Sequence, residues 1–235
     1  MKKTKSTGAP VPEQLIHAEF NLYALAHGAK ILGYPPVVAG GSRANTLHYI
    51  ANDMLVNPGE LVLVDAGVEY HGYCGDITRT FPITGKFTEA QRELYEVVLN
   101  TNERCLERLQ HRRSFSPMSL HDLHEFSCRV MVEEAAKLGI DGKFVRGRLY
   151  PHHVSHYLGL DVHDTPTSSK SSPLSEGMIL TIEPGIYVPY DRDFPEKYRG
   201  IGIRVEDNVL LTTEGAEVLT SRAPKTIKEI EETMK

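Results

Sequence analysis

The feature that most constrains this sequence is a pair of aspartates, Asp65 and Asp76, within two neighbouring runs of apolar and β-branched residues. The runs Leu61–Val68 and Tyr73–Ile83 are separated by a short segment that ends in Gly72, the pattern of two strands joined by a tight turn. The sequence therefore predicts a β-hairpin that carries one aspartate on each strand.

The register of this hairpin decides whether the two carboxylates meet. A turn centred between Tyr70 and His71 places Asp65 directly opposite Asp76, and directly opposed side chains share a face with their Cβ atoms roughly 4.5–5.5 Å apart. Two carboxylates so close repel and raise each other's pKa unless a positive charge lies between them. Asp65 also shares its face with leucines, so its carboxylate is expected to be buried and to need a partner. The pair indicates a cation site; taken alone, it could instead form the polar ends of an exposed hairpin face.

Composition narrows the class of protein. The chain has 235 residues, of which 40% are hydrophobic and 24% charged, as in ordinary globular proteins. A net charge of −5 gives no support for nucleic-acid binding, and no apolar run is long enough to cross a membrane. Three cysteines without a Cys-x-x-Cys pair argue against a disulfide framework or a zinc knuckle and fit a reducing compartment. The N-terminus lacks the apolar core of a signal peptide, so we expect a cytoplasmic protein, or a mitochondrial one if the chain is a fragment of a longer precursor.

Helical periodicity appears in three segments, and a fourth segment is the charged end of the chain. Thr88 with Gln91, and Ser119 with Asp122, have the pattern of capping boxes that begin helices. The helix after Thr88 has the strongest apolar stripe, and the basic run 111–113 is expected in the turn between these two helices. The predicted helices span residues 12–32, 88–109, 119–138 and, as a charged and frayed end, 225–235.

Strands are predicted on both sides of the two central helices. Residues 37–50 are expected to form a short strand, a Gly-Gly turn and a second strand that ends near His48. Strands return in two runs after Met178, where Glu183 follows the first apolar run and Glu206 lies in the second. The order is therefore hairpin, two helices, hairpin, with two carboxylates on each hairpin, which predicts an α+β domain.

Four carboxylates and one histidine are the candidate metal ligands. Such an oxygen-rich set suits hard or borderline divalent ions, and no cysteine is placed to complete a structural zinc site. Four carboxylates carry a charge that two divalent ions neutralise, and two ions about 3.5–4 Å apart are the usual hydrolytic arrangement. Each member also has a structural alternative, since Glu183 could simply end a strand and Glu206 could pair with Arg204 or Arg79. The candidates are Asp65, Asp76, His156, Glu183 and Glu206.

Several stretches of the sequence resemble one peptidase family. They are YPPVVAGG, LHY, VDAG with DITRTFP, HHVSHYLGLDVHDTP, IEPGIY and RGIGIRVEDNV, in this order between about Phe20 and Leu211. Together they resemble aminopeptidase P, the Xaa-Pro aminopeptidases of metallopeptidase family M24, and most closely the Xaa-Pro aminopeptidase 3 group. The resemblance implies the pita-bread (creatinase/aminopeptidase) fold, in which helices cover the outside of a curved antiparallel sheet and a dinuclear metal site lies inside the curve.

The resemblance also implies a role for each candidate. Asp65 would bind one metal ion, while Asp76 and Glu206 would bridge two. His156 and Glu183 would complete the second ion's shell. Mn²⁺ is the preferred ion, with Co²⁺, Mg²⁺ and Zn²⁺ as alternatives.

Further residues match the family's catalytic helpers. His163 is the histidine expected near the scissile bond, and Arg204 lies beside the bridging glutamate. The residues implied to contact substrate are Tyr34, His156 and His163. The residues implied to assist catalysis are His48, His152, His163, Glu183 and Arg204.

The chain departs from the family at its N-terminal end. The family's catalytic domain usually opens with a further helix and follows an N-terminal domain, and neither has a counterpart in this sequence, so the first helix of the fold is expected to be missing. The expected division is a flexible segment at residues 1–11, a catalytic domain at 12–222 and a charged tail at 223–235. The expected assembly is a homodimer.

The predicted function is hydrolysis of the first bond in peptides whose second residue is proline. A hydroxide bridging the two ions would attack the carbonyl carbon, because two cations lower the pKa of bound water. Glu183 would carry the proton and His163 would stabilise charge on the carbonyl oxygen. Proline's nitrogen carries no hydrogen, so a site shaped for a tertiary amide can admit this bond. The alternatives are a prolidase or methionine aminopeptidase of the same fold, or a pita-bread protein that binds peptides without catalysis.

Overall fold

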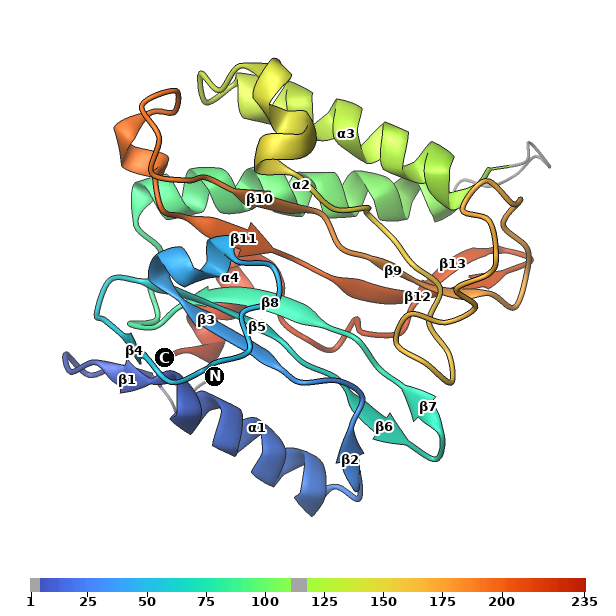
Figure 1. Ribbon diagram of the computed structural model, residues 1–235, viewed down its shortest axis with the longest axis horizontal. Coiled ribbons are helices and arrows are strands. Elements are labelled where there is room, and N and C mark those ends of the chain that lie inside the picture. The colour runs from blue at the N-terminus through green and yellow to red at the C-terminus, as the bar shows by residue number, and fades with distance from the viewer. Residues whose placement is uncertain (1–4, 111–117) are drawn as a thin grey trace.

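The computed structural model describes residues 5–110 and 118–235 (Figure 1). Its helices are α1 (Glu13–Ala26), α2 (Glu89–Gln110), α3 (Leu120–Ala136) and α4 (Ile227–Thr233). The strands form a curved layer, with α1 along one side and α2 and α3 along the other (Figure 1). This arrangement confirms the predicted α+β class, a curved antiparallel sheet covered by helices.

The strands of the described residues pair antiparallel in two halves of the molecule. In the N-terminal half, β1 (Val11–Pro12) pairs with β4 (Leu55–Val56), β6 (Val68–Tyr70) lies between β2 (Ile31–Leu32) and β7 (Tyr73–Cys74), and β5 (Leu61–Asp65) lies between β3 (Val37–Gly40) and β8 (Thr78–Pro82). In the C-terminal half, β10 (Gly185–Tyr187) pairs with β11 (Gly202–Arg204), and β12 (Asp207–Thr212) lies between β9 (Ile179–Ile182) and β13 (Gly215–Val218).

Strands β8 and β11 connect the two halves. The Thr80 hydroxyl donates to the Arg204 carbonyl oxygen at 3.0 Å and accepts from the Arg204 amide at 3.2 Å. Beyond the end of β11, the Glu206 amide donates to the Thr78 carbonyl oxygen at 3.0 Å. The two hairpins that carry the predicted ligands therefore lie side by side, which brings Asp76 within reach of Glu206.

The predicted register of the aspartate hairpin is wrong by two residues. Asp65 lies opposite Thr78, because the turn is centred on His71 and Gly72. Both turn residues have positive φ angles, 52° for His71 and 86° for Gly72. A two-residue turn that matches the right-handed twist of the strands requires such angles, and glycine adopts them readily at the second position. A shift of two residues keeps side chains on the same face, since strands alternate with a period of two. Asp65 and Asp76 therefore still share a face, as diagonal rather than direct neighbours.

The second strand predicted after the Gly-Gly turn is not formed, and Gly41–Asn45 is a short 3-10 helix instead. The cause is the Glu13 carboxylate, which is fully buried at the start of α1. It accepts hydrogen bonds from the Gly40 amide at 2.8 Å, from Arg43 Nε at 2.7 Å and from the Tyr49 hydroxyl at 2.9 Å. A buried charge needs such partners, so this segment wraps around Glu13 instead of extending as a strand.

Both predicted capping boxes are confirmed. Thr88 and Gln91 exchange hydrogen bonds between side chain and backbone at 2.9 and 3.3 Å before α2. Ser119 and Asp122 do the same before α3. None of the helices in the described part of the chain is both long enough and apolar enough to span a bilayer.

Other predictions concern the ends of segments. Helix α1 ends at Ala26, earlier than predicted, because Gly28 adopts a φ of 91° and residues 31–32 form β2. The basic run 111–113 lies outside the described residues. Within the segment predicted to be flexible, the Ser6 amide donates to the Ile83 carbonyl oxygen at 2.9 Å. The division at residues 11 and 222 stays a prediction.

The C-terminal end of the chain is a packed helix. Helix α4 begins with a capping box between Thr226 and Glu229. Its apolar side chains Ile227, Ile230 and Met234 are buried. The helix predicted for residues 225–235 is confirmed, but it is packed and not frayed, because apolar residues at i, i+3 and i+7 give this charged segment one buried face.

We expect Ile230→Ala to lower the free energy of unfolding by about 2–5 kcal/mol, because it deletes a fully buried side chain and leaves a cavity. The matched control is Lys228→Ala on the exposed side of the same helix, which should stay within about 0.5 kcal/mol of the wild type. Urea denaturation measures both. A near-zero effect in both variants would mean that α4 is not packed.

Candidate metal centre

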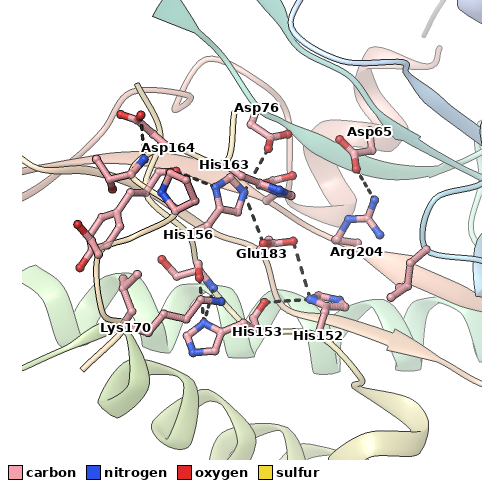
Figure 2. A pocket seen from close by; sticks show the side chains of 18 of the residues that line it. Asp65, Asp76, His152, His153, His156, His163, Asp164, Lys170, Glu183 and Arg204 are labelled. Carbon is pink, nitrogen blue, oxygen red and sulfur yellow. Dashed lines mark hydrogen bonds and ion pairs between the residues drawn. The ribbon is translucent and has the colours of Figure 1, made fainter. Parts of the chain in front are cut away.

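The five predicted ligands line one cavity of about 420 Å³, and Figure 2 labels all of them except Glu206. Asp65 is the last residue of β5, and Asp76 lies in the loop between β7 and β8. His156 comes from the segment before β9, Glu183 directly follows β9, and Glu206 lies between β11 and β12. Residues from both halves of the chain thus reach a single pocket.

Asp76, His156 and Glu206 form the tightest group, with one ligand atom of each within 4.8 Å of the others. His156 Nε2 lies 3.3 Å from Asp76 Oδ2 and 3.7 Å from Glu183 Oε1. Burial acts to lower the pKa of His156, but its contacts with the two carboxylates outweigh burial and raise that pKa. The negative charge of the surrounding carboxylates therefore favours the protonated form of the imidazole.

Asp65 is held by two other groups. Arg204 Nη2 donates to Asp65 Oδ2 at 2.5 Å, and the Tyr34 hydroxyl lies 2.5 Å from both Asp65 Oδ1 and Asp76 Oδ1. One phenol has a single proton to donate, so two carboxylates share it. Burial, and then the charges of these aspartates, raise the pKa of Tyr34 well above its usual range. Tyr34, predicted to contact substrate, thus contacts two predicted metal ligands.

Glu206 provides the test of whether these residues suit a cation. Its carboxylate is 1% exposed; Oε2 accepts a hydrogen bond from the Thr78 hydroxyl at 2.7 Å, and Oε1 has no hydrogen-bond partner. Burial and the charges of Asp76 and Glu183 raise the pKa of Glu206 well above its usual range. Arg204 and Arg79 were the possible ion-pair partners of Glu206 in the sequence, but neither binds its side chain. Arg204 pairs with Asp65 instead. A buried, unpartnered carboxylate oxygen among other carboxylates fits a divalent cation.

Glu183 and His152 occupy the wall next to this group. Burial raises the pKa of Glu183 to about 7. His152 Nδ1 lies 3.8 Å from Glu183 Oε2, and His152 Nε2 is 2.8 Å from the Tyr187 hydroxyl. Burial, and then the charge of Arg204, lower the pKa of His152 to about 3, so its imidazole is neutral near pH 7. A carboxyl that titrates near neutral pH is able both to accept and to release a proton.

His163 and His48 line the same cavity. The ring centroid of His163 is 4.5 Å from that of His156, with the two rings edge to face. Burial, and then the charge of His156, lower the pKa of His163. His48 is exposed to solvent. The structure therefore places both histidines on the wall that a ligand in the cavity would meet.

Two residues that the sequence did not single out belong to the site. Thr78 accepts from Arg204 Nε at 3.0 Å and donates to Glu206, and strand alternation from Asp76 could have identified it. The Tyr187 hydroxyl accepts from Arg204 Nη1 at 2.8 Å. Tyr187 lies two residues from Gly185, which is directly opposite Arg204, so the register between β10 and β11 brings the two side chains together on one face.

Comparison with known proteins agrees with this geometry. The model of metallopeptidase family M24 matches residues 2–213. The chain belongs to metallopeptidase family M24. Its fold is the predicted pita-bread fold, since it superposes on Escherichia coli aminopeptidase P with a TM-score of 0.90 and 40% identity, over 99% of this chain and 53% of that one.

Two curated relatives of this M24 chain are equally informative. It is 47% identical to Xaa-Pro aminopeptidase 3 of Rattus norvegicus, and the aligned region covers 95% of this chain and 45% of that protein. It is 41% identical to the mitochondrial intermediate cleaving peptidase 55 of Arabidopsis thaliana over 96% of its length, again 45% of the relative. The chain therefore spans about half the length of the curated relatives it matches.

The raised pKa values lead to a prediction about stability. Above about pH 4.5, the usual pKa of a glutamate, the metal-free folded chain holds protons on Glu183 and Glu206 that the unfolded chain has released, so its free energy of unfolding falls as pH rises toward and beyond 7. Divalent metal removes this penalty by favouring the ionised, folded form. We expect a chelator to lower the melting temperature of metal-loaded protein at pH 7.5, and to lower it less at pH 5. Calorimetry at both pH values measures this, and equal shifts would contradict a buried carboxylate cluster.

Proposed function

We propose that this chain is the catalytic domain of an Xaa-Pro aminopeptidase, which releases the first residue of peptides that have proline in second position. The observation that carries the proposal is the convergence of Asp65, Asp76, His156, Glu183 and Glu206 on one cavity. Pita-bread proteins that only bind peptides are expected to have lost ligands, and all five are present here. Membership of family M24 and the names of the relatives support the same activity.

We further propose that the site holds two divalent ions, with Mn²⁺ preferred over Co²⁺, Mg²⁺ or Zn²⁺. The four carboxylates supply the charge that two dications neutralise, and the unpartnered oxygen of Glu206 supports a ligand role there. Asp76 and Glu206 belong to the tightest group and are the residues proposed to contact both ions. When bound, two such ions lower the pKa of a water molecule and polarise a peptide carbonyl.

The protein's own groups would handle the proton and the substrate. Glu183, whose carboxylate lines the cavity beside His152, would accept the proton of the attacking water and pass it to the departing proline nitrogen. His163 would donate a hydrogen bond to the carbonyl oxygen as negative charge develops there. His152, fixed by Tyr187, would orient Glu183, and Arg204 would keep Asp65 ionised and in place. His48 and His156 line the cavity and would contact the substrate, while Tyr34 would hold Asp65 and Asp76 from beside it.

Two further proposals concern assembly and location. A homodimer is proposed from the resemblance alone, and the particle mass in solution tests it. We propose the cytoplasm as the location of a protein with this sequence, and the mitochondrion if the chain is a fragment of a longer precursor. The mitochondrial relative from Arabidopsis thaliana supports the second case.

The proposed site predicts a metal content. Protein loaded with Mn²⁺ and freed of excess ion should contain close to two ions per chain, because four carboxylates leave one dication with uncompensated negative charge. Elemental analysis measures the ratio. Folded protein that retains no ion would overturn the enzymatic proposal.

The roles of ligand and helper predict different mutants. Glu206→Gln should lose both metal and activity, because a neutral amide cannot offset two adjacent dications. His163→Ala should keep both ions and lose about 10²–10⁴-fold in turnover, because it removes a group proposed to act on the substrate. Cleavage of Xaa-Pro peptides and metal content are measured on the same samples.

A substrate panel completes this experiment. Dipeptides with a C-terminal proline test for a prolidase, and peptides that begin with methionine but lack proline test for a methionine aminopeptidase.

Loss of metal in His163→Ala would show that His163 is a metal ligand. Full activity in the same variant would show that His163 is only structural.

A further inference from the structure

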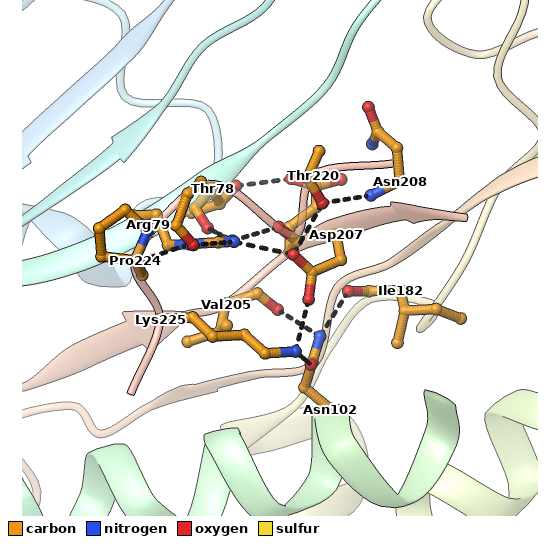
Figure 3. Close-up of polar contacts among 12 residues, drawn as sticks. Thr78, Arg79, Asn102, Ile182, Val205, Asp207, Asn208, Thr220, Pro224 and Lys225 are labelled. Carbon is orange, nitrogen blue, oxygen red and sulfur yellow. Dashed lines mark hydrogen bonds and ion pairs between the residues drawn. The ribbon is translucent and has the colours of Figure 1, made fainter. Parts of the chain in front are cut away.

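Figure 3 shows a polar network among residues that neighbour the predicted ligands in sequence. Arg79 follows Thr78 in β8, so its side chain leaves the opposite face of the strand from the one that carries Thr78 toward Glu206. Arg79 is 5% exposed, Asp207 is 1% exposed and Asn102 of α2 is fully buried. Buried polar groups of this kind need partners, and these find them in one another and in the backbone.

Arg79 ties the backbone of a predicted ligand to the C-terminal segment. Its Nη1 donates to the carbonyl oxygens of Thr78 and Glu206. Its Nη2 donates to Asp207 Oδ1 at 2.8 Å, and its Nε donates to the Pro224 carbonyl oxygen at 3.0 Å. The position of Glu206 is thus coupled to residues that precede α4.

Asn102 holds the two strands that lead to the glutamates. Its Nδ2 lies 3.1 Å from the Ile182 carbonyl oxygen and 3.5 Å from the Val205 carbonyl oxygen. These two residues directly precede Glu183 and Glu206. The side-chain amide of Asn102 therefore links the backbones next to two predicted ligands.

Lys225 joins these two parts of the network. Its Nζ donates to Asn102 Oδ1 and to Asp207 Oδ2, both at 2.9 Å. The Tyr95 hydroxyl donates to the Lys225 carbonyl oxygen at 2.7 Å and fixes the backbone from which the side chain extends. Asp207 Oδ1 also accepts from the Thr220 hydroxyl at 2.8 Å. A single cation from the C-terminal segment thus holds the amide and the carboxylate together.

The same network reaches a third ligand. The Thr220 hydroxyl accepts a hydrogen bond from the backbone N–H of Asn208 at 3.1 Å. Asn208 in turn exchanges hydrogen bonds with the backbone of Asp76, with its Oδ1 accepting from the Asp76 amide at 3.2 Å and its Nδ2 donating to the Asp76 carbonyl oxygen. The backbones at or next to Asp76, Glu183 and Glu206 all belong to one connected set.

We propose that Lys225 and Asp207 are positioning residues of the metal centre, through which the C-terminal segment fixes the spacing of three ligands. The proposal rests on the proposed function only in requiring that the site bind divalent ions. Without the Lys225 ammonium group, Asn102 Oδ1 and Asp207 Oδ2 lose their common donor, and the strands before Glu183 and Glu206 are held less firmly. Groups that orient metal ligands in this way change metal affinity by about 10–100-fold.

The test compares three variants of the full chain. Lys225→Met removes the charge and keeps the length of the side chain, Lys225→Arg restores a cation, and Lys228→Met makes the same change at an exposed residue of α4. The Mn²⁺ dissociation constant is measured by calorimetry, and the melting temperature with and without Mn²⁺. We expect Lys225→Met to raise the dissociation constant about 10–100-fold and to shrink the rise in melting temperature on metal binding. Lys225→Arg should recover most of the affinity, and Lys228→Met should match the wild type.

A folded Lys225→Met protein with wild-type affinity for Mn²⁺ overturns the inference, as does an equal loss in Lys228→Met. If Lys225→Met does not fold, Asp207→Asn replaces it, because that change keeps the shape of the side chain and removes the charge that pairs with Lys225. Unchanged affinity in folded Asp207→Asn would then overturn the inference. Wild-type protein that binds Mn²⁺ without cleaving Xaa-Pro peptides overturns the proposed function alone, and wild-type protein that binds no Mn²⁺ overturns both.

Discussion

Repulsion among four carboxylates that share one cavity is the constraint on which the rest of this structure depends. Each carboxylate leaves water on folding, and each raises the proton affinity of its neighbours. The protein offsets part of this cost with specific partners: Arg204 on Asp65, the Thr78 hydroxyl on Glu206 and His156 against Asp76. An oxygen of Glu206 nevertheless keeps no partner. The arrangement is therefore unfavourable by itself and becomes favourable when cations are bound.

The scaffold holds these groups together from the side away from the cavity. The carboxylates come from two hairpins that helices α2 and α3 separate in sequence, and β8 against β11 brings the hairpins side by side. Strand alternation then separates two kinds of side chain. One face of β8 carries the Thr78 hydroxyl to Glu206, and the other carries Arg79 into the polar network with Asp207 and Lys225 that Figure 3 shows. A rigid backbone on one face is what allows repelling groups to stay close on the other.

Predictions based on local pattern and resemblance succeeded where the physics is local. The capping boxes before α2 and α3 need only residues three positions apart, and both are formed. One error arose where a distant partner intervened, because the buried Glu13 carboxylate recruits Arg43 and Tyr49 and prevents the predicted strand. Two others were local: the turn at His71 and Gly72 set the register of the aspartate hairpin, and the spacing of apolar residues in the charged C-terminal segment gives α4 a buried face.

The sequence by itself determined which residue types could form the site and which faces they would occupy, because alternation along a strand is a local property that survived even a register shift of two residues between Asp65 and Asp76. Only the tertiary structure decided the pairing. Arg204 binds Asp65, 139 positions away, and not its neighbour Glu206, while Lys225 binds Asp207 from beyond the last strand. These choices depend on how two hairpins pack across β8 and β11, and periodicity within each hairpin carries no information about the register between them.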